Sequence, residues 1–347
     1  MDSLITNTSL LQHAMRDEAL NERREEIGLL HPLMTKDVLL PTKPINELFL
    51  AIRRVVAMRE TGCCFTGHSG VGKSSALEVV DAMLRIKMPK LCVVHHDTHS
   101  QQMPSIRAFF KHFLTSVKHS QLKGETFDLR QRLVNWLVDE AKLSGLNMVV
   151  IFIDEAQLMT IQDFNFLKDV FNDLSKDGVQ LITILMAQSP DFDSVIDTLK
   201  NERRLDLIGR FAMRILPFRA YNCAEDLKLI LNGIDMAVFP EGSGITWTEF
   251  YFPNAFGAGF RLVGQLDSFM DAITTSAPKT KPMHFDFPAR QTFMAIRAFM
   301  FDNAGADCAG MSVADDAWKK AVEYAKVADA MEMMRVSDRS VTCAIEV

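Results

Sequence analysis

The sequence GHSGVGKSS at residues 67–75 decides the fold class of this chain. It follows a hydrophobic run at residues 62–66 (GCCFT) and opens a segment of helical periodicity at residues 73–86. A strand, a glycine-rich turn and a helix in this order form a phosphate-binding loop of the pattern GxxxxGK[ST]. The glycines let backbone N–H groups surround phosphate oxygens, and the helix N-terminus adds its positive dipole end. We therefore predict phosphate contacts from Gly67, His68, Ser69, Gly70, Val71, Gly72, Lys73, Ser74 and Ser75.

Two side chains of this loop predict the cofactors. The ammonium group of Lys73 can reach the β- and γ-phosphates of a nucleotide, and the Ser74 hydroxyl can ligate a metal ion. ATP and Mg²⁺ are therefore the expected cofactors. The alternative is a glycine-rich turn that contains a lysine by chance, which the flanking strand and helix disfavour.

A second motif, MVVIFIDEAQ, ends another hydrophobic run with two carboxylates. A buried parallel strand would deliver Asp154 to the carboxyl edge of the sheet, beside the phosphate-binding loop. We predict that Asp154 and Ser74 hold Mg²⁺ and that Glu155 activates the attacking water. A solvated helix cap is the alternative for an acidic pair taken alone.

Short hydrophobic runs alternate with amphipathic segments up to about residue 219, and this alternation predicts an α/β fold with a parallel sheet. The expected strands are residues 62–66, 91–95, 148–153, 181–187 and 213–216. The clearest expected helices are residues 127–143 and residues 161–175, the latter with Thr160 as N-cap. Beyond the last strand, helical periodicity covers residues 221–236, 260–275, 289–303 and 313–334. The glycine-, proline- and aromatic-rich residues 240–259 predict a loop or an insertion.

Polar residues after the later strands are candidates for catalysis. Gln188 ends the fourth hydrophobic run, where it could contact the γ-phosphate or the water, although a polar strand end is an equal alternative. The segment NERRLDLIGRF offers an arginine to a neighbouring subunit's nucleotide, with Arg210 favoured and Arg204 second. Arg261 in GAGFRLVGQL could touch the phosphates from a helical lid. Surface charge is the alternative for each arginine.

Bulk composition excludes several classes of protein. The chain has 347 residues, 48% of them hydrophobic, with a formal net charge of −6, which gives no general attraction to nucleic acid or to a membrane. The six cysteines form no CxxC pair, and no segment resembles a signal peptide or a membrane span. We expect a cytoplasmic protein without a membrane partner.

Taken together, these motifs resemble the AAA+ ATPases. GHSGVGKS, FIDEAQ, the polar Gln188, GRF and a later FR follow the order of that family's motifs over about residues 45–275. The resemblance implies a five-stranded parallel sheet of order 5-1-4-3-2, a C-terminal helical lid and nucleotide sites shared between subunits. It divides the chain into an N-terminal arm (1–44), an α/β nucleotide-binding core (45–219) and a helical lid with C-terminal helices and tail (220–347).

Within AAA+, the chain looks most like the transposition regulators of the TnsC, TniB and MuB group. The DEAQ form of the acidic motif and the RRLDLIGRF segment carry this resemblance. It implies ATP-dependent rings or filaments on double-stranded DNA that link target-selection proteins to a transposase, with partners of the TnsA, TnsB and TniQ type. Two alternatives stay open: an ATPase acting on a protein substrate, like the ExeA-type secretion ATPases, and a nucleotide switch that does not hydrolyse ATP.

An inner surface that contacts DNA would need basic side chains. The resemblance points to the segment between the second and third strands, which supplies Arg107, Lys111, Lys118 and Lys123. A solvated helix face is the alternative for any one of them. The nearby histidines of VVHHDTH are poor candidates for a metal site, because neighbours on a strand point to opposite faces. The aromatic residues 247–252 could form a docking surface or pack under the lid.

Overall fold

The computed structural model describes residues 27–35, 38–99, 105–277 and 286–335. The chain divides into two compact units, which we call the α/β unit and the helical unit. Of the described residues, the α/β unit comprises 41–99, 105–222, 286–290 and 329–335, and the helical unit comprises 27–35, 38–40, 223–277 and 291–328. Both units are therefore built from segments that are distant in the sequence.

The α/β unit contains a five-stranded sheet in the order β2-β3-β4-β1-β5, in which every pairing is parallel. Read from the other edge, this is the predicted order 5-1-4-3-2. The strands are β1 (Gly62–Gly67), β2 (Cys92–Asp97), β3 (Met148–Asp154), β4 (Gln180–Gln188) and β5 (Ile215–Pro217). Each predicted strand is present, and the predicted fold class is confirmed.

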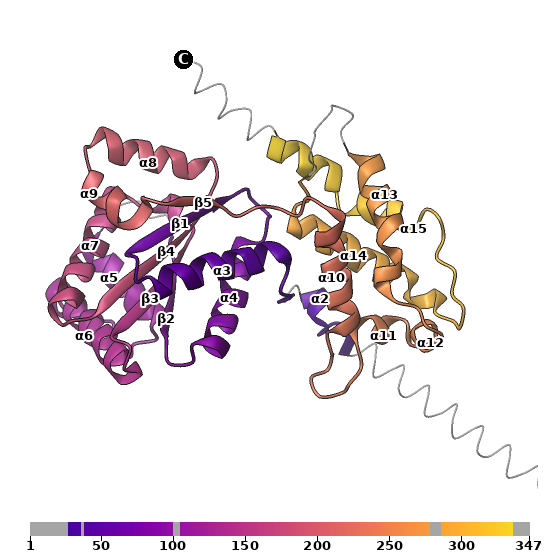
Figure 1. Ribbon diagram of the computed structural model, residues 1–347, viewed down its shortest axis with the longest axis horizontal. Helices are drawn as coiled ribbons and strands as arrows, with labels where there is room; N and C mark the ends of the chain where they lie inside the picture. The colour runs from indigo at the N-terminus through magenta and orange to yellow at the C-terminus, as the bar shows by residue number, and fades with distance from the viewer. Residues whose placement is uncertain (1–26, 36–37, 100–104, 278–285, 336–347) are drawn as a thin grey trace, which may run out of the picture. The chain divides into compact units, whose positions relative to one another are not determined.

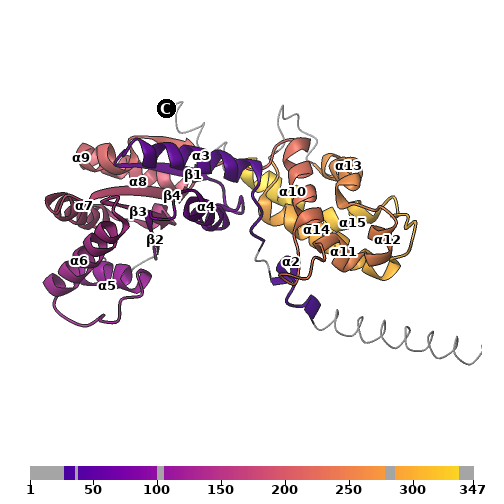
Figure 2. The ribbon, with the colours of Figure 1, turned by 60° about the horizontal axis from the view of Figure 1, so that its bottom comes forward.

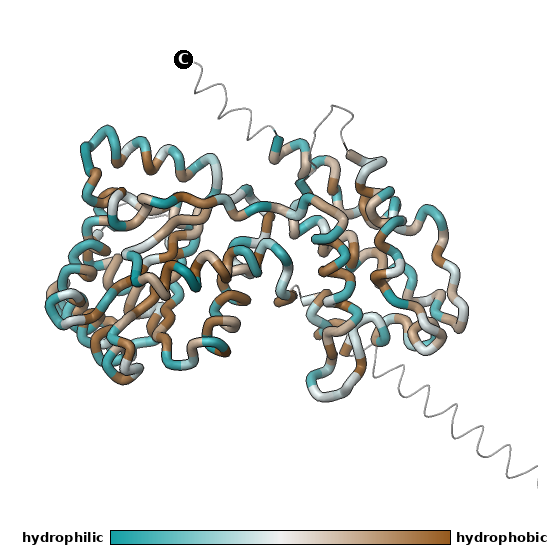
Figure 3. Tube along the Cα trace, in the orientation of Figure 1, coloured by the Kyte–Doolittle hydropathy of each residue, from teal (hydrophilic) through white to brown (hydrophobic). Residues whose placement is uncertain are grey.

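Helices cover both faces of this sheet (Figures 1 and 2), as strands buried on both sides require. Alternate residues of each strand enter two hydrophobic cores; Ile151 packs on one face and Phe152 on the other. The first core contains α5 (Ile106–Ser116), α6 (Thr126–Ser144), α7 (Ile161–Lys176) and α8 (Asp191–Asn201). The second contains α3 (Lys43–Ala57) and α4 (Lys73–Lys87). Figure 3 shows the hydrophobic residues concentrated along the central strands.

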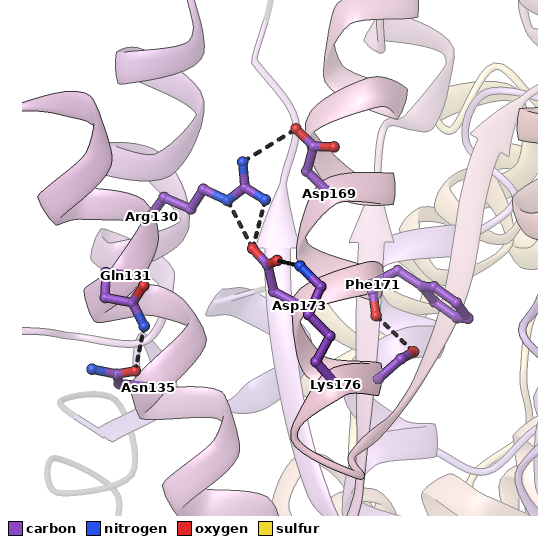
Figure 4. A network of polar contacts seen from close by, with 8 residues as sticks. Arg130, Gln131, Asn135, Asp169, Phe171, Asp173 and Lys176 are labelled. Carbon is purple, nitrogen blue, oxygen red and sulfur yellow. Dashed lines mark hydrogen bonds and ion pairs between the residues drawn. The ribbon is translucent and has the colours of Figure 1, made fainter.

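Helices α6 and α7 are joined by a network of charges (Figure 4). The Arg130 guanidinium of α6 donates to Asp173 from Nε (2.8 Å) and Nη2 (2.6 Å) and to Asp169 from Nη1 (3.3 Å). Lys176 pairs with the second oxygen of Asp173 at 3.0 Å. The start of α7 is fixed by a capping box, in which Thr160 and Asp163 exchange hydrogen bonds. Thr160 is thus the N-cap that the sequence predicted.

The helical unit holds most of the remaining elements, although α14 begins within the α/β unit at residues 289–290. They are α2 (Pro32–Thr35), α10 (Ala224–Met236), α11 (Trp247–Tyr251), α12 (Pro253–Gly257), η3 (Leu262–Gln265), α13 (Leu266–Ser276), α14 (Ala289–Asn303), η4 (Ala304–Ala306) and α15 (Ala317–Tyr324). The ring of Trp318 stacks against Phe299 (3.9 Å between centroids) and Phe269 (4.2 Å) in the core of this unit. No helix among the described residues is long and apolar enough to span a membrane.

The prediction of a loop at residues 240–259 is wrong in part. Helices α11 and α12 lie there, and a capping box between Thr246 and Glu249 starts α11. The aromatic residues of this segment are not an open docking surface, because Trp247, Phe250 and Tyr251 surround the buried side chain of His31. The ring of His31 lies 4.8–5.2 Å from the ring centroids of Phe239, Trp247, Phe250 and Tyr251, which we call the aromatic cage.

Candidate nucleotide site

The phosphate-binding loop joins β1 to α4 and needs its glycines for two different reasons. Gly70 and Gly72 have φ angles of +80° and +90°, in the left-handed region that side chains disfavour. A Cβ atom at Gly67 would lie only 2.6 Å from the Phe218 carbonyl oxygen of the neighbouring segment. The backbone conformation that the motif requires is therefore present, and the loop ends on the N-terminus of α4.

Lys73 is the first residue of α4, and its side chain is only 7% exposed. Its Nζ donates hydrogen bonds to the carbonyl oxygens of Gly67 (3.1 Å) and His68 (3.0 Å). Burial lowers the pKa of Lys73, whereas the carboxylates of Glu155, Asp154 and Asp191 act in the opposite direction. These carboxylates and carbonyls favour an ammonium group inside the loop.

Ser74 and Asp154 come together from distant parts of the chain. The Ser74 hydroxyl donates to Oδ2 of Asp154 at 2.5 Å, at the carboxyl end of β3. Burial raises the pKa of Asp154 and the Glu155 and Asp97 carboxylates add to this, while hydrogen bonds from Ser74 and the Glu155 N–H lower it. A hydroxyl and a carboxylate beside a glycine loop are the oxygen donors that Mg²⁺ accepts next to nucleotide phosphates, so the residues fit ATP with Mg²⁺.

Glu155 follows Asp154 and has an unusual backbone conformation. Its φ is +54°, and its N–H donates to Oδ1 of Asp154 at 2.8 Å. Its carboxylate accepts a hydrogen bond from Nε2 of Gln157. The sequence prediction gave Gln157 no role, although it lies in the quoted FIDEAQ stretch and a polar residue there was the available signal.

Gln188 ends β4 directly beside the loop, because its register partner in β1 is Gly67. Its side-chain Nε2 donates to Asp191 at the start of α8 at 2.8 Å, and its backbone N–H donates to Gln157 at 2.8 Å. The structure therefore places Gln188 at the predicted edge. The part of this residue that touches the acidic motif is its main chain.

A contact between the phosphate-binding loop and residues 286–290 was not predicted from the sequence. Residues 286–290, which precede most of α14, return to the α/β unit, where Phe287 and Tyr221 form an antiparallel bridge. The backbone N–H of Arg290 then donates to the carbonyl oxygen of Gly70 at 3.0 Å. Sequence periodicity carries no signal for such a contact, because it depends on where a distant segment returns.

The two candidate finger arginines differ in their partners. Arg204 pairs with Asp206 at 3.1 Å and donates to Asn165 at 2.6 Å, and together with Lys168 it holds the pKa of Asp206 well below its usual range. Arg210 has neutral partners: it donates to Asn172 at 2.9 Å and lies 5.0 Å from the ring centroid of Phe171. Arg204 is therefore the more firmly held of the two.

Arg261 lies in the helical unit, at the N-cap of η3. Its Nη1 donates to the carbonyl oxygens of Phe256 (2.9 Å) and Phe260 (2.6 Å), and its guanidinium lies 3.6 Å from the Phe256 ring centroid. These contacts are all within the helical unit. A role of Arg261 at the nucleotide stays a prediction.

The predicted DNA-contacting residues lie on α5 and on the segment that follows it. Arg107 and Lys111 are one turn apart on α5, and the side chains of all four residues (Arg107, Lys111, Lys118 and Lys123) are exposed. Within the described part of the chain, no ion pair involves any of them. The helix itself has no acidic residue, so the charges of Arg107 and Lys111 are not balanced within α5.

The two histidines within β2, His95 and His96, point to opposite faces of the sheet as strand geometry dictates. On one face of the sheet, Nε2 of His95 lies 3.2 Å from Oδ2 of Asp81. On the other face, Nδ1 of His96 is hydrogen-bonded to Oγ of Ser116 at 3.0 Å, and the His96 ring stacks on Phe113. Burial, with His112 and His99 adding to it, lowers the pKa of His96 to about 3. No cluster of His, Cys, Asp or Glu that could hold a metal ion occurs in the described residues.

Comparisons with known proteins agree on the fold. Residues 57–196 match the family model of the AAA domain, and no curated protein matches the chain. The ORC2 protein of Aeropyrum pernix, solved in ADPNP–ADP complexes, aligns with 84% of this chain and 71% of its own, at 15% identity and a TM-score of 0.52. The ORC1 protein of Aeropyrum pernix in complex with DNA aligns with 86% and 68%, at 15% identity and a TM-score of 0.48. The chain therefore has an AAA domain and the AAA+ P-loop fold with C-terminal helices.

Proposed function

We propose that this chain, with its AAA+ P-loop fold, is an ATPase that hydrolyses ATP with Mg²⁺ at the carboxyl edge of its sheet. One observation carries the proposal: the Ser74 hydroxyl and the Asp154 carboxylate meet at 2.5 Å, in the loop that also buries Lys73. The chain had to bring residues separated by 80 positions together to build this arrangement. A solvated helix cap at Asp154 would not produce it.

Each residue has a distinct role in this proposal. The backbone N–H groups of the loop and the Lys73 ammonium hold the phosphates, and Ser74 and Asp154 supply oxygen ligands for the metal. When bound, Mg²⁺ neutralises negative charge on the phosphates. Glu155 accepts a proton from the attacking water, because its carboxylate lies next to the metal ligand Asp154 and outside the sheet.

The variant Glu155→Gln tests the ATPase proposal. Removing the base should lower turnover by about 100-fold or more, while the fluorescence titration of an ATP analogue should give unchanged affinity. Glu140→Gln, at a partly exposed position near the C-terminal end of α6, makes the same chemical change outside the residues assigned to the site and should retain full turnover. Normal turnover in Glu155→Gln would exclude Glu155 as the base.

Completion of the site by a neighbouring subunit is the second part of the proposal. Among the described residues Arg210 has only neutral partners, so it can leave them for a phosphate at little cost, whereas Arg204 would have to break its ion pair with Asp206. We expect Arg210→Ala to bind ATP normally but to lose most of its turnover. In the unaltered chain, specific activity should rise with protein concentration because a neighbour completes the site, and this rise should be absent in the variant. Arg204→Ala is the matched comparison, and equal turnover of Arg210→Ala and the wild-type chain would remove this assignment.

The third part concerns DNA and transposition. The cations of α5 and the following segment, which are exposed and form no ion pair within the described residues, support an ATP-dependent ring or filament on double-stranded DNA, held by phosphate contacts. The resemblance to the TnsC, TniB and MuB group supplies the finer proposal. In it the assembly links target-selection proteins of the TniQ type to transposase subunits of the TnsA and TnsB type.

Electron microscopy of the chain mixed with duplex DNA and a slowly hydrolysed ATP analogue tests this part. We expect ordered rings or filaments on the DNA that require the nucleotide and disappear at high salt. Assembly that is identical without DNA would contradict the DNA proposal and favour a protein substrate. Pull-down of the DNA-bound assembly with a transposase subunit then tests the link to transposition.

A further inference from the structure

Gln157 bridges the acidic motif and the strand beside the phosphate-binding loop. It lies in η1 (Ala156–Leu158), the short helix that follows β3. Its Nε2 donates to Oε2 of Glu155, and its Oε1 accepts from the backbone N–H of Gln188 at 2.8 Å. Both polar atoms of this side-chain amide are therefore used, one on the predicted base and one on the end of β4.

The direction of the amide is fixed by its partners. A backbone N–H can only donate and an ionised carboxylate can only accept. Because the Gln188 N–H faces Oε1, the NH₂ group must face Glu155. In a flipped amide, the NH₂ group would face the N–H donor of Gln188 and the amide oxygen would face the carboxylate of Glu155, and neither hydrogen bond could form. Gln157 is therefore a rigid link of defined polarity.

The backbone of Glu155 explains why such a link is useful. A non-glycine residue with φ near +54° is uncommon and costs free energy, so the surrounding contacts must maintain it. The Glu155 N–H is held by Asp154, which leaves the side chain to be oriented by another group. The side-chain hydrogen bond to this carboxylate comes from Gln157.

The other end of the link lies next to the phosphate-binding loop. Gln188 is paired with Gly67 in the sheet, and the backbone N–H of Ser189 donates to the Gly67 carbonyl oxygen at 3.1 Å. That same carbonyl accepts from Lys73. A short chain of bonds thus runs from the loop lysine through the end of β4 and Gln157 to Glu155.

We infer that Gln157 is a positioning residue that sets the carboxylate of Glu155 relative to the phosphate-binding loop. The inference rests on the proposed function, since it assumes that Glu155 is the base. Gln157 itself contacts neither nucleotide nor water in this role. It acts by holding one oxygen of Glu155, so that the other oxygen faces the attacking water.

The isosteric variant Gln157→Glu separates positioning from a purely structural role. Its carboxylate keeps an acceptor for the Gln188 N–H, but it places a negative charge where the amide donated to Glu155. We expect kcat to fall by about tenfold or more, since a misplaced base loses a large part of its contribution. KM for ATP and the affinity for an ATP analogue should change by less than about twofold, because these contacts do not bind the nucleotide.

Gln131→Glu is the matched control, because Gln131 lies exposed on α6 and bonds only with Asn135 among the described residues (Figure 4). It should retain the kcat of the unaltered chain. Gln157→Glu with normal kcat would overturn the inference, and so would a loss that appears mainly in KM. Circular dichroism of each variant checks that the fold is kept.

A double variant keeps this result distinct from a failure of the proposed function. In the Glu155→Gln background, Gln157→Glu should cause no further loss, because residues that act as one unit are not additive. A further loss of tenfold in that background would show that Gln157 acts elsewhere and would overturn the inference. If Glu155→Gln alone turned over normally, the assignment of the base would fall first, and the inference would fall with it.

Discussion

Lys73 and His31 are both basic side chains buried in the protein, and their surroundings differ completely. Lys73 is 7% exposed in the α/β unit and faces two carbonyl oxygens with carboxylates nearby. His31 is 0% exposed in the helical unit and faces four aromatic rings. Its Nδ1 accepts from the Leu33 N–H at 3.2 Å, and its Nε2 has no hydrogen-bond partner among the described residues.

Burial lowers the pKa of both residues, so burial alone does not distinguish them. The carboxylates around Lys73 oppose the effect, whereas nothing opposes it at His31, whose pKa falls to about 4. The carboxylates and carbonyl oxygens around Lys73 thus favour a charge that a phosphate can use. His31 stays neutral inside the aromatic cage.

The variant Lys73→Ala tests the first half of this comparison and should have the largest effect, a loss of ATP affinity. Removing a buried charge that pairs with phosphate should weaken ATP binding by about 1000-fold, or about 4 kcal/mol. Fluorescence titration with an ATP analogue measures the change. Lys87→Ala, at the exposed C-terminal end of the same helix, should bind normally. Wild-type affinity in Lys73→Ala would mean that the buried ammonium is not a phosphate ligand.

The variant His31→Phe tests the second half of the comparison, the burial of His31 as a neutral base. Because the pKa of His31 is about 4 when folded and 6.5 when unfolded, the unfolded chain binds the extra proton between these values. The free energy of unfolding should therefore fall as the pH falls through this window, by up to about 3 kcal/mol from this residue. Phenylalanine fills the cage without titrating, so His31→Phe should lose less stability between pH 7 and pH 5.

Urea unfolding followed by tryptophan fluorescence measures this difference, because Trp247 forms part of the cage. His119→Phe, at a partly exposed position outside the cage, makes the same substitution and is the matched comparison. His96, whose pKa is about 3, titrates in the same direction and remains in both variants. Identical pH dependence in His31→Phe and the unaltered chain would show that His31 is not buried as a neutral base.

The exposed cations of α5 should give the smallest effect per residue of these variants, measured as a loss of DNA affinity. Surface charges in water gain little from any single contact, so the double variant Arg107→Ala/Lys111→Ala should weaken DNA binding only modestly. It should lower the slope of log K against log salt by about 2, because each lost phosphate contact removes about 0.9. Lys87→Ala/Lys90→Ala makes the same charge change at the C-terminal end of α4 and in the segment that follows it. An equal slope in both variants would argue against α5 as the DNA-contacting face.

Much of the α/β unit could be predicted from local patterns. The glycine loop, the hydrophobic runs and the Thr160 cap each depend on residues close in sequence, and the sheet order follows from the resemblance that these motifs carry. The prediction of a loop at residues 240–259 was wrong in part. Glycines, prolines and aromatic residues predict irregular structure more strongly than Thr246 and Glu249 predict the start of a helix. The roles of the site residues, and the domain boundaries, stay predictions.

The sequence by itself determined which residues can carry charge to a nucleotide and in what order they occur. Only the tertiary structure decided which partners each residue has. It bound Gln157 to Glu155 and to the end of β4, returned Arg290 to Gly70, and inserted His31 into an aromatic cage. The physical reason is that motifs and periodicity depend on neighbours along the chain, whereas hydrogen-bond partners and burial depend on segments that meet only after folding.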